Sequence, residues 1–352
     1  MTLGNHSIVT QFLLLRLSTD PHIQALLFVL FLEIYLLTLM GNLMMLLVIR
    51  ADSHLHMPMF FFLSHLSLLD LCLSSVTVPK MLNDLLSETK TISLRGCLAQ
   101  GFFVLITAGT ECFLLSAMAY DRYAAICHPL LYGQMMKKQL CVQLVWGSWG
   151  LASLNAFINT LLAANLDFCE NHTISHYSCE VPSLFPLSCS DVSINLIVLL
   201  CSSLMHGFGT LLPLVFSYAR IVSTILSISS TSGRSKTFST CSSHLTAVSF
   251  FFGSGFLRYL MPTSGSPLEL IFSVQYGVVT PMVNPLIYSL KNKEVKAAVR
   301  RTLGKYMRWS RWKNKARGKW RIRIKWCQLD IMRVLTKKNF LALCKVICYK
   351  IN

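Results

Sequence analysis

The sequence predicts an all-α membrane protein, a bundle of seven transmembrane helices. Only 13% of the 352 residues are charged, whereas 53% are hydrophobic; an average soluble domain is nearer a quarter charged. The apolar residues also recur in seven runs of 23 to 26 residues, the length of a tilted helix that crosses about 30 Å of hydrocarbon. These features disfavour a soluble globular enzyme and a disordered chain. The predicted spans are residues 25–49, 58–82, 98–121, 141–164, 194–219, 239–262 and 268–290.

Basic residues in the connections predict the orientation of the bundle. One side carries three of them, Arg16, Lys90 and Arg95, within residues 1–24 and the loops before the third and fifth spans. The other side carries seven before the C-terminal segment is counted: Arg50, Arg122, Lys137, Lys138, Arg220, Arg234 and Lys236. We therefore expect an extracellular N-terminus (1–24) and a cytoplasmic C-terminus. No cleavable signal peptide is evident, so the first span is expected to act as the targeting signal.

The formal net charge of +17 belongs to the end of the chain. Residues 291–352 hold 20 of the 32 basic residues and two acidic ones, so residues 1–290 are almost neutral. Such a composition could bind nucleic acid, but a segment tethered beneath a membrane seldom meets it. An anionic inner leaflet is the better match. We expect no nucleic-acid partner.

Two features of the predicted outer side agree with this orientation. Asn5 and Asn171 are candidate glycosylation acceptors in Asn-x-Ser/Thr motifs. Four cysteines also lie on this side, where disulfides persist: Cys97, Cys169, Cys179 and Cys189. Four cysteines allow three connectivities, and the residues alone do not choose among them.

Polar side chains inside spans are candidate functional groups because they are costly in a membrane. Asp70 and Glu111 are mid-span in the second and third helices, with Asn42 and Asn284 as candidate partners. They form either a network that fixes helix packing or an ion or proton site.

Two further motifs suit a conformational switch. At the inner end of the third span, Asp121 can hold Arg122 through a charge-assisted hydrogen bond, next to Tyr123. The alternative is an Arg that snorkels to lipid headgroups. In the seventh span, Pro281 and Pro285 interrupt the helical hydrogen bonds around Asn284, one turn before Tyr288. The alternative there is a passive kink.

Four segments carry a family resemblance: residues 55–64 (LHMPMFFFLS), 118–127 (MAYDRYAAIC), 236–245 (KTFSTCSSHL) and 281–288 (PMVNPLIY). With these motifs in this order, the chain resembles rhodopsin-class G-protein-coupled receptors, and more narrowly the tetrapod-type (class II) olfactory receptors. The resemblance covers about residues 5–305 and implies an odorant receptor of the plasma membrane, in the cilia of olfactory neurons. It implies a small-molecule odorant as ligand and a stimulatory, olfactory-type heterotrimeric G protein as partner, which raises cyclic AMP. It implies neither an enzyme nor a cofactor.

The resemblance also assigns residues. It implies disulfides between Cys97 and Cys179 and between Cys169 and Cys189. Residues 176–180 (HYSCE) match a metal-site pattern suggested for the family, but an oxidised Cys179 could not be a thiolate ligand, so no metal is expected. The implied switch and G-protein-coupling residues are Asp121, Arg122, Tyr123, Tyr218, Asn284, Pro285 and Tyr288. The implied odorant pocket comprises Val104, Leu105, Ala108, Gly109 and Cys112 on one face of the third span, with Ser202, Ser203, His206, Gly255, Phe256, Tyr259, Val274 and Gly277.

The chain departs from the family pattern in several places, and three of them bear on function. Phe252 stands where members usually have Tyr, and Arg258 where they have an apolar residue; Arg258 either snorkels outward or favours an acidic odorant. After an expected short amphipathic helix on the membrane surface (291–305), the chain adds a basic, Trp-rich cytoplasmic extension (306–352). Two other functional interpretations stay open: a transporter or channel, and a receptor-like chain that reaches the surface poorly and signals little.

Overall fold

A computed structural model describes residues 11–15, 17–168, 173–260, 267–302 and 304, with the main chain alone for residues 236, 239, 240, 256–260, 267, 290 and 291. The chain divides into two compact units, Met1–Val299 and Arg300–Asn352. Almost all described residues belong to the first unit, which contains the helix bundle and the candidate functional site. The bundle is described here by itself.

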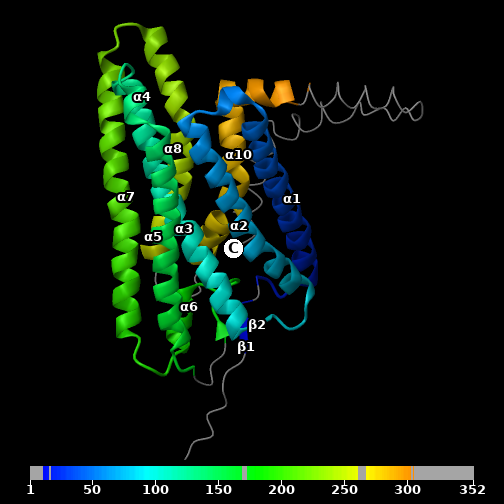
Figure 1. The fold of residues 1–352 in the computed structure, drawn as a ribbon. Helices are drawn as coiled ribbons and strands as arrows, with labels where there is room; N and C mark the ends of the chain where they lie inside the picture. Colours follow the sequence, from blue (N-terminus) through cyan, green and yellow to red (C-terminus); the bar gives the residue numbers. More distant parts are fainter. Residues whose placement is uncertain (1–10, 16, 169–172, 261–266, 303, 305–352) are drawn as a thin grey trace, which may run out of the picture. The chain divides into compact units, whose positions relative to one another are not determined.

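The bundle consists of seven long helical segments within the described residues (Figure 1). Six are single helices: α1 (Pro21–Ala51), α2 (Pro58–Leu86), α3 (Leu94–Cys127), α5 (Lys138–Ala164), α7 (Ser193–Ser227) and α8 (Thr231–Leu260). The seventh is continuous but composite, with α9 (Pro267–Val274), a π-helical segment (Gln275–Val279) and α10 (Thr280–Lys291). The predicted seven-helix architecture is confirmed.

The helices are longer than the predicted spans, mainly at the end of the bundle where Asp121 lies. α3 runs to Cys127 and α7 to Ser227, whereas hydropathy placed the ends at 121 and 219. Hydropathy marks only the part of a helix in hydrocarbon, and a helix can continue through the headgroup region. Six of the described segments are long and apolar enough to span a membrane; α8 is not among them because Ser, Thr and basic residues fill its first half, residues 231–244.

Local sequence signals explain where several helices begin. Asp20 caps α1 by accepting a hydrogen bond from the His22 amide at 2.8 Å, and Pro21 and Pro58 occupy the first positions of α1 and α2, where a missing N–H costs nothing. The Ser93 hydroxyl caps α3 by accepting from the Gly96 amide at 3.1 Å.

α3 is the central helix of the bundle and packs against α2, α5, α7 and α8. The outward faces of the peripheral helices carry large exposed apolar side chains, among them Leu47 on α1, Trp146 on α5 and Leu212 on α7. In a soluble protein such surfaces would aggregate, whereas in a bilayer they contact lipid. The apolar composition therefore serves both a packed interior and a lipid-facing exterior.

A small β-sheet caps one end of the bundle, an element that the all-α prediction did not contain. The strands are β1 (Gln11–Leu14), β2 (Thr91–Ser93) and β3 (Thr173–Ile174), in the order β2-β1-β3. β1 pairs antiparallel with β2 and parallel with β3. Phe12 is fully buried under this cap, and its ring meets that of Phe168 edge-on at 5.2 Å.

Short segments complete the first unit. They are the single-turn helices α4 (Tyr132–Met135) and α6 (Val181–Leu184), and two 3₁₀ turns, Ser53–Leu55 and Phe185–Leu187. Residues 293–302, which cross from the first unit into the second, are helical. The extension 306–352 lies outside the described residues.

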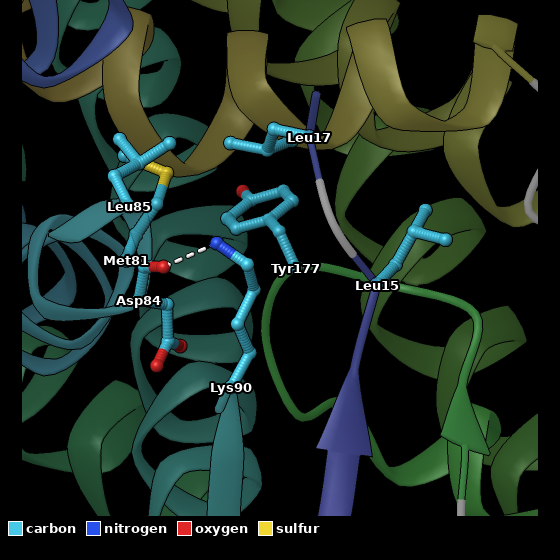
Figure 2. Close-up of a pocket in the computed structure, with 7 residues that line it drawn as sticks. All are labelled: Leu15, Leu17, Met81, Asp84, Leu85, Lys90 and Tyr177. Carbon is cyan, nitrogen blue, oxygen red and sulfur yellow. Dashed lines mark hydrogen bonds between the residues drawn. The ribbon is translucent and has the colours of Figure 1, made fainter. Parts of the chain in front are cut away.

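A small cavity lies beside the β-cap, and its size excludes it as a ligand site (Figure 2). Its volume is about 10 Å³, which leaves room for about one water molecule. The buried Lys90 ammonium donates a hydrogen bond to the main-chain oxygen of Asp84 at its wall. The lining residues are Leu15, Leu17, Met81, Asp84, Leu85, Lys90 and Tyr177.

Candidate functional site

A second cavity, of about 240 Å³, lies inside the bundle. Its walls come from α3, α5, α7, α8 and the composite seventh helix, and the segment that follows Cys179 also contributes. Nine of the thirteen residues predicted for the odorant pocket line it: Val104, Leu105, Ala108, Gly109, Cys112, Ser202, Ser203, His206 and Gly255.

The other four predicted residues do not line this cavity or cannot be placed. The side chains of Phe256 and Tyr259 lie outside the described part of the chain. On the seventh helix, Ser273 and Tyr276 line the cavity instead of Val274 and Gly277. Consecutive helical residues point about 100° apart, so the cavity-facing positions are one residue earlier than the predicted ones.

Val274 and Gly277 have other neighbours. Val274 packs with an apolar cluster formed mainly by α1, α2 and α10. Gly277 faces the loop between α5 and α7, since a Cβ atom on Gly277 would be 3.1 Å from the Tyr177 hydroxyl of that loop. That hydroxyl donates a hydrogen bond to the Ser273 carbonyl at 3.0 Å and so ties the loop to α9.

The cavity also contains residues that sequence reasoning missed, notably Asn155 on α5 and Glu180 in the outer loop. Asn155 had a detectable signal, because an amide inside an apolar span needs a partner. Its Oδ1 accepts hydrogen bonds from the Ser202 hydroxyl at 2.5 Å and from the Asn159 amide at 3.0 Å. The disulfide of the neighbouring Cys179 positions Glu180 at the cavity, so the sequence around Glu180 does not reveal its place.

Cys179 is bonded to Cys97, as the resemblance implied, so the outer loop is fixed to the start of α3. The Cys179 amide also donates to Gln100 Oε1 at 2.7 Å. Because Cys179 is oxidised, residues 176–180 lack the thiolate that the suggested metal pattern would use. Cys189 is disulfide-bonded as well; its implied partner Cys169 lies outside the described residues, as do the glycosylation acceptors Asn5 and Asn171.

A buried polar network joins three helices below the cavity. The Asn284 amide of α10 donates to both carboxyl oxygens of Asp70 on α2, at 3.1 and 3.3 Å. Asn284 also lies close enough to Glu111 on α3 to interact with that carboxyl group. The Asn42 amide of α1 donates instead to the Pro281 carbonyl, at 2.9 Å.

α1 and α10 approach each other closely at this network. A Cβ atom on Gly41 would lie 3.0 Å from Pro285 Cγ, so a larger residue at this position would press on the Pro285 ring where it packs against α1. The Pro281 carbonyl cannot accept a hydrogen bond from residue 285, because Pro285 has no N–H group. It accepts one from the Asn42 side chain instead. The interrupted helix is thus held by side chains from its neighbours, as expected for a broken transmembrane helix.

The C-terminal end of α3 carries a compact charged cluster. Asp121 is fully buried and accepts from Arg122 at 2.5 Å and from the Tyr132 hydroxyl of α4 at 2.8 Å. Burial and the Asp121 carboxylate raise the pKa of the Tyr132 phenol, so this hydroxyl stays a donor throughout the physiological pH range. Tyr123 turns away from this cluster, and its hydroxyl lies 2.9 Å from His128 Nε2.

A second contact joins α7 to α8 near the same end of the bundle. The Tyr218 hydroxyl lies 2.6 Å from His244 Nδ1, and the two rings stack. Tyr288 on α10 is completely buried, and its hydroxyl has no hydrogen-bond partner among the described residues. His244 escaped the sequence prediction of switch residues, although it lies within the motif at 236–245.

Comparison with known proteins places the chain in a family. The family model described as "Olfactory receptor" matches residues 31–306. Olfactory receptor 8S1 of Homo sapiens is 72% identical over 296 residues, which are 84% of this chain and 82% of that protein. Olfactory receptor 5A2 of Homo sapiens is 49% identical, over 85% of this chain and 93% of that protein.

Among solved structures, squid rhodopsin matches with a TM-score of 0.65 at 18% identity, over 81% of this chain and 82% of that one. This likeness confirms the fold of a rhodopsin-like bundle. The family match and the close relatives confirm the resemblance that the motifs predicted. The chain therefore belongs to the olfactory receptor family of G-protein-coupled receptors, which are multi-pass proteins of the plasma membrane and not enzymes.

Proposed function

We propose that the chain is an odorant receptor that binds a small volatile molecule in the 240 Å³ cavity and raises cyclic AMP through a stimulatory, olfactory-type G protein. The cavity itself is the observation that supports this most. It lies between helices, its lining is mostly apolar, and it is smaller than the roughly 300–1,000 Å³ typical of drug-sized ligands. Those properties suit a volatile compound with one or two polar groups.

In this proposal the N-terminus and the β-cap are extracellular, and the Asp121 cluster faces the cytoplasm. The excess of basic residues in the loops on the Asp121 side supports that orientation. Under the same assignment, the extension 306–352 lies beneath the plasma membrane of olfactory neuron cilia.

Ligand binding would act through elements that have two possible arrangements. The cavity is lined by α7, α8 and the seventh helix, which also carry Tyr218, His244 and Asn284. A ligand that shifts these helices would rearrange their inner contacts and release Arg122 from Asp121. The freed guanidinium would then be available to the G protein.

A cyclic AMP reporter screen of a diverse odorant panel tests the proposal, with Arg122→Ala as the discriminating variant. We expect at least one odorant to raise cyclic AMP in cells that express the chain, and Arg122→Ala to lose that response. Arg50→Ala is the matched control, because Arg50 is an exposed arginine at the inner end of α1. A transporter or channel would be largely insensitive to Arg122→Ala, and a silent panel with verified surface expression would contradict the receptor function.

Tyr132→Phe is expected to raise basal cyclic AMP. The substitution removes one of the two groups that hold Asp121, a hydrogen bond to a charged group worth about 1.5–3 kcal/mol, and so loosens the hold on Arg122. We expect a several-fold increase in unstimulated reporter signal at equal surface expression. Tyr120→Phe is the control, because Tyr120 is an exposed tyrosine on α3, next to Asp121. A basal signal at the wild-type level would show that this cluster does not restrain the inactive state.

A further inference from the structure

We infer that the cavity selects odorants with a hydroxyl group, such as alcohols and phenols, over ethers and ketones of the same shape. This inference rests on the proposed function and names the chemistry of its ligand. It follows from which polar atoms in the cavity wall already have hydrogen-bond partners and which do not. The central residue is His206 of α7.

The main-chain contact of His206 determines what its ring can offer. His206 Nδ1 lies 2.8 Å from the Ser202 carbonyl oxygen, one helical turn earlier. A carbonyl oxygen only accepts hydrogen bonds, so Nδ1 carries the hydrogen of this contact. In the neutral imidazole the other ring nitrogen, Nε2, then has a lone pair and is an acceptor.

His206 Nε2 is buried and has no hydrogen-bond partner among the described residues. The residue is 7% exposed, and its ring is 5.2 Å from that of Phe113. Nε2 lies beside α3, since a Cβ atom on Gly109 would be 3.1 Å away from it. Both His206 and Gly109 line the cavity, so this unsatisfied acceptor lies at the α3–α7 wall.

The serine hydroxyls of the same wall already donate their hydrogens within the protein. Ser203 donates to the Leu199 carbonyl at 2.8 Å. The single hydroxyl hydrogen of Ser202 is shared between Asn155 Oδ1 at 2.5 Å and the Val198 carbonyl at 2.7 Å. Such bonds back to the preceding turn leave only oxygen lone pairs for a ligand. These two hydroxyls therefore add acceptors to the cavity rather than donors.

The charge of the cavity points the same way. Glu180 contributes a carboxylate, which when ionised only accepts hydrogen bonds, and no Lys or Arg occurs among the described lining residues. A carboxylic acid odorant would bring a second negative charge, so this wall disfavours acids. Asn155 and the Tyr276 hydroxyl can each both donate and accept, so they can pair with alcohols, ethers and ketones alike. His206 Nε2 only accepts, which makes it the atom that discriminates between ligands. A ligand hydroxyl can pair with it, whereas an ether or ketone oxygen cannot.

Matched odorant sets test the inference in the full-length chain with the cyclic AMP reporter. Each set contains an alcohol, its methyl ether and the ketone of the same carbon skeleton. We expect the alcohol to reach its half-maximal response at a concentration about tenfold lower than the other two, equivalent to about 1.4 kcal/mol. In His206→Phe, which keeps an aromatic ring but has no acceptor nitrogen, the three compounds should agree within about twofold.

The matched control is His65→Phe, because His65 lies on α2 and is not among the cavity residues. It should retain the preference for the alcohol. If ethers or ketones activate the wild-type chain as well as alcohols do, the receptor function stands and the hydroxyl preference is overturned. A preference that survives in His206→Phe overturns the role of His206. If the wild-type chain reaches the surface and responds to no compound, the proposed function and this inference are both overturned. If His206→Phe fails to reach the surface, the wild-type responses to the matched compounds alone decide whether the hydroxyl preference exists.

Discussion

Asp70→Leu is expected to abolish the odorant response. Asp70 is 2% exposed, and both of its carboxyl oxygens accept from the Asn284 amide. Leucine has a similar branched shape, with a larger volume and no acceptor, so the Asn284 amide would lose both of its contacts with Asp70 and keep only Glu111 as a neighbour. Leaving a buried polar group unsatisfied costs about 1–3 kcal/mol, and α10 would also lose its tie to α2 beside Pro285, where its own hydrogen bonding is interrupted.

The measurement is maximal odorant-evoked cyclic AMP, normalised to surface expression. Asp70→Asn keeps one acceptor oxygen and should retain part of the response, which separates loss of the hydrogen bond from loss of the charge. Ser67→Ala is the control on the same helix, since Ser67 is equally buried at 2% exposure. A wild-type maximum in Asp70→Leu would show that the Asp70–Asn284 contact has no part in signalling.

The sequence predicted the long helices well because the membrane imposes a simple rule. A helix in hydrocarbon must be apolar along its whole length, and such a run can be seen without knowing the fold. α8 was found in the same way, although its polar first half makes it the weakest span. The three short strands left no such signal, because β1 and β3 have only four and two residues and depend on partners far along the chain.

The candidate cavity was predictable to within one helical position. The α3 residues Val104 to Cys112 share a face at helical spacing, and all five predicted ones line the cavity. On the seventh helix, the prediction was displaced from Ser273 and Tyr276 to their neighbours. Helix rotation depends on packing, and the sequence alone does not reveal it. Glu180 could not be found from the spans at all, because it lies in a loop and reaches the cavity through the disulfide of the adjacent Cys179.

That disulfide gives the other large prediction: Cys97→Ser is expected to remove nearly all receptor from the cell surface. The bond joins residues 82 apart in the sequence, and losing a loop closure of that length costs about 4 kcal/mol in the chain-entropy model. Most single domains have only about 5–15 kcal/mol of stability, so the loss would leave a large fraction unfolded. The outer loop would also lose its fixed position over the cavity.

Staining of intact cells through an N-terminal epitope tag measures the effect. Because Cys97 and Cys179 act through one bond, Cys179→Ser and the double variant should each reduce surface expression as much as Cys97→Ser does. The control is Cys201→Ser, since Cys201 is a free, exposed cysteine on α7. A double variant far worse than either single variant would mean that each cysteine also acts outside the bond, whereas near-normal staining of all three would show that packing alone holds the loop. Because the tag is stained without opening the membrane, a positive signal for the wild type also establishes that the N-terminus is extracellular.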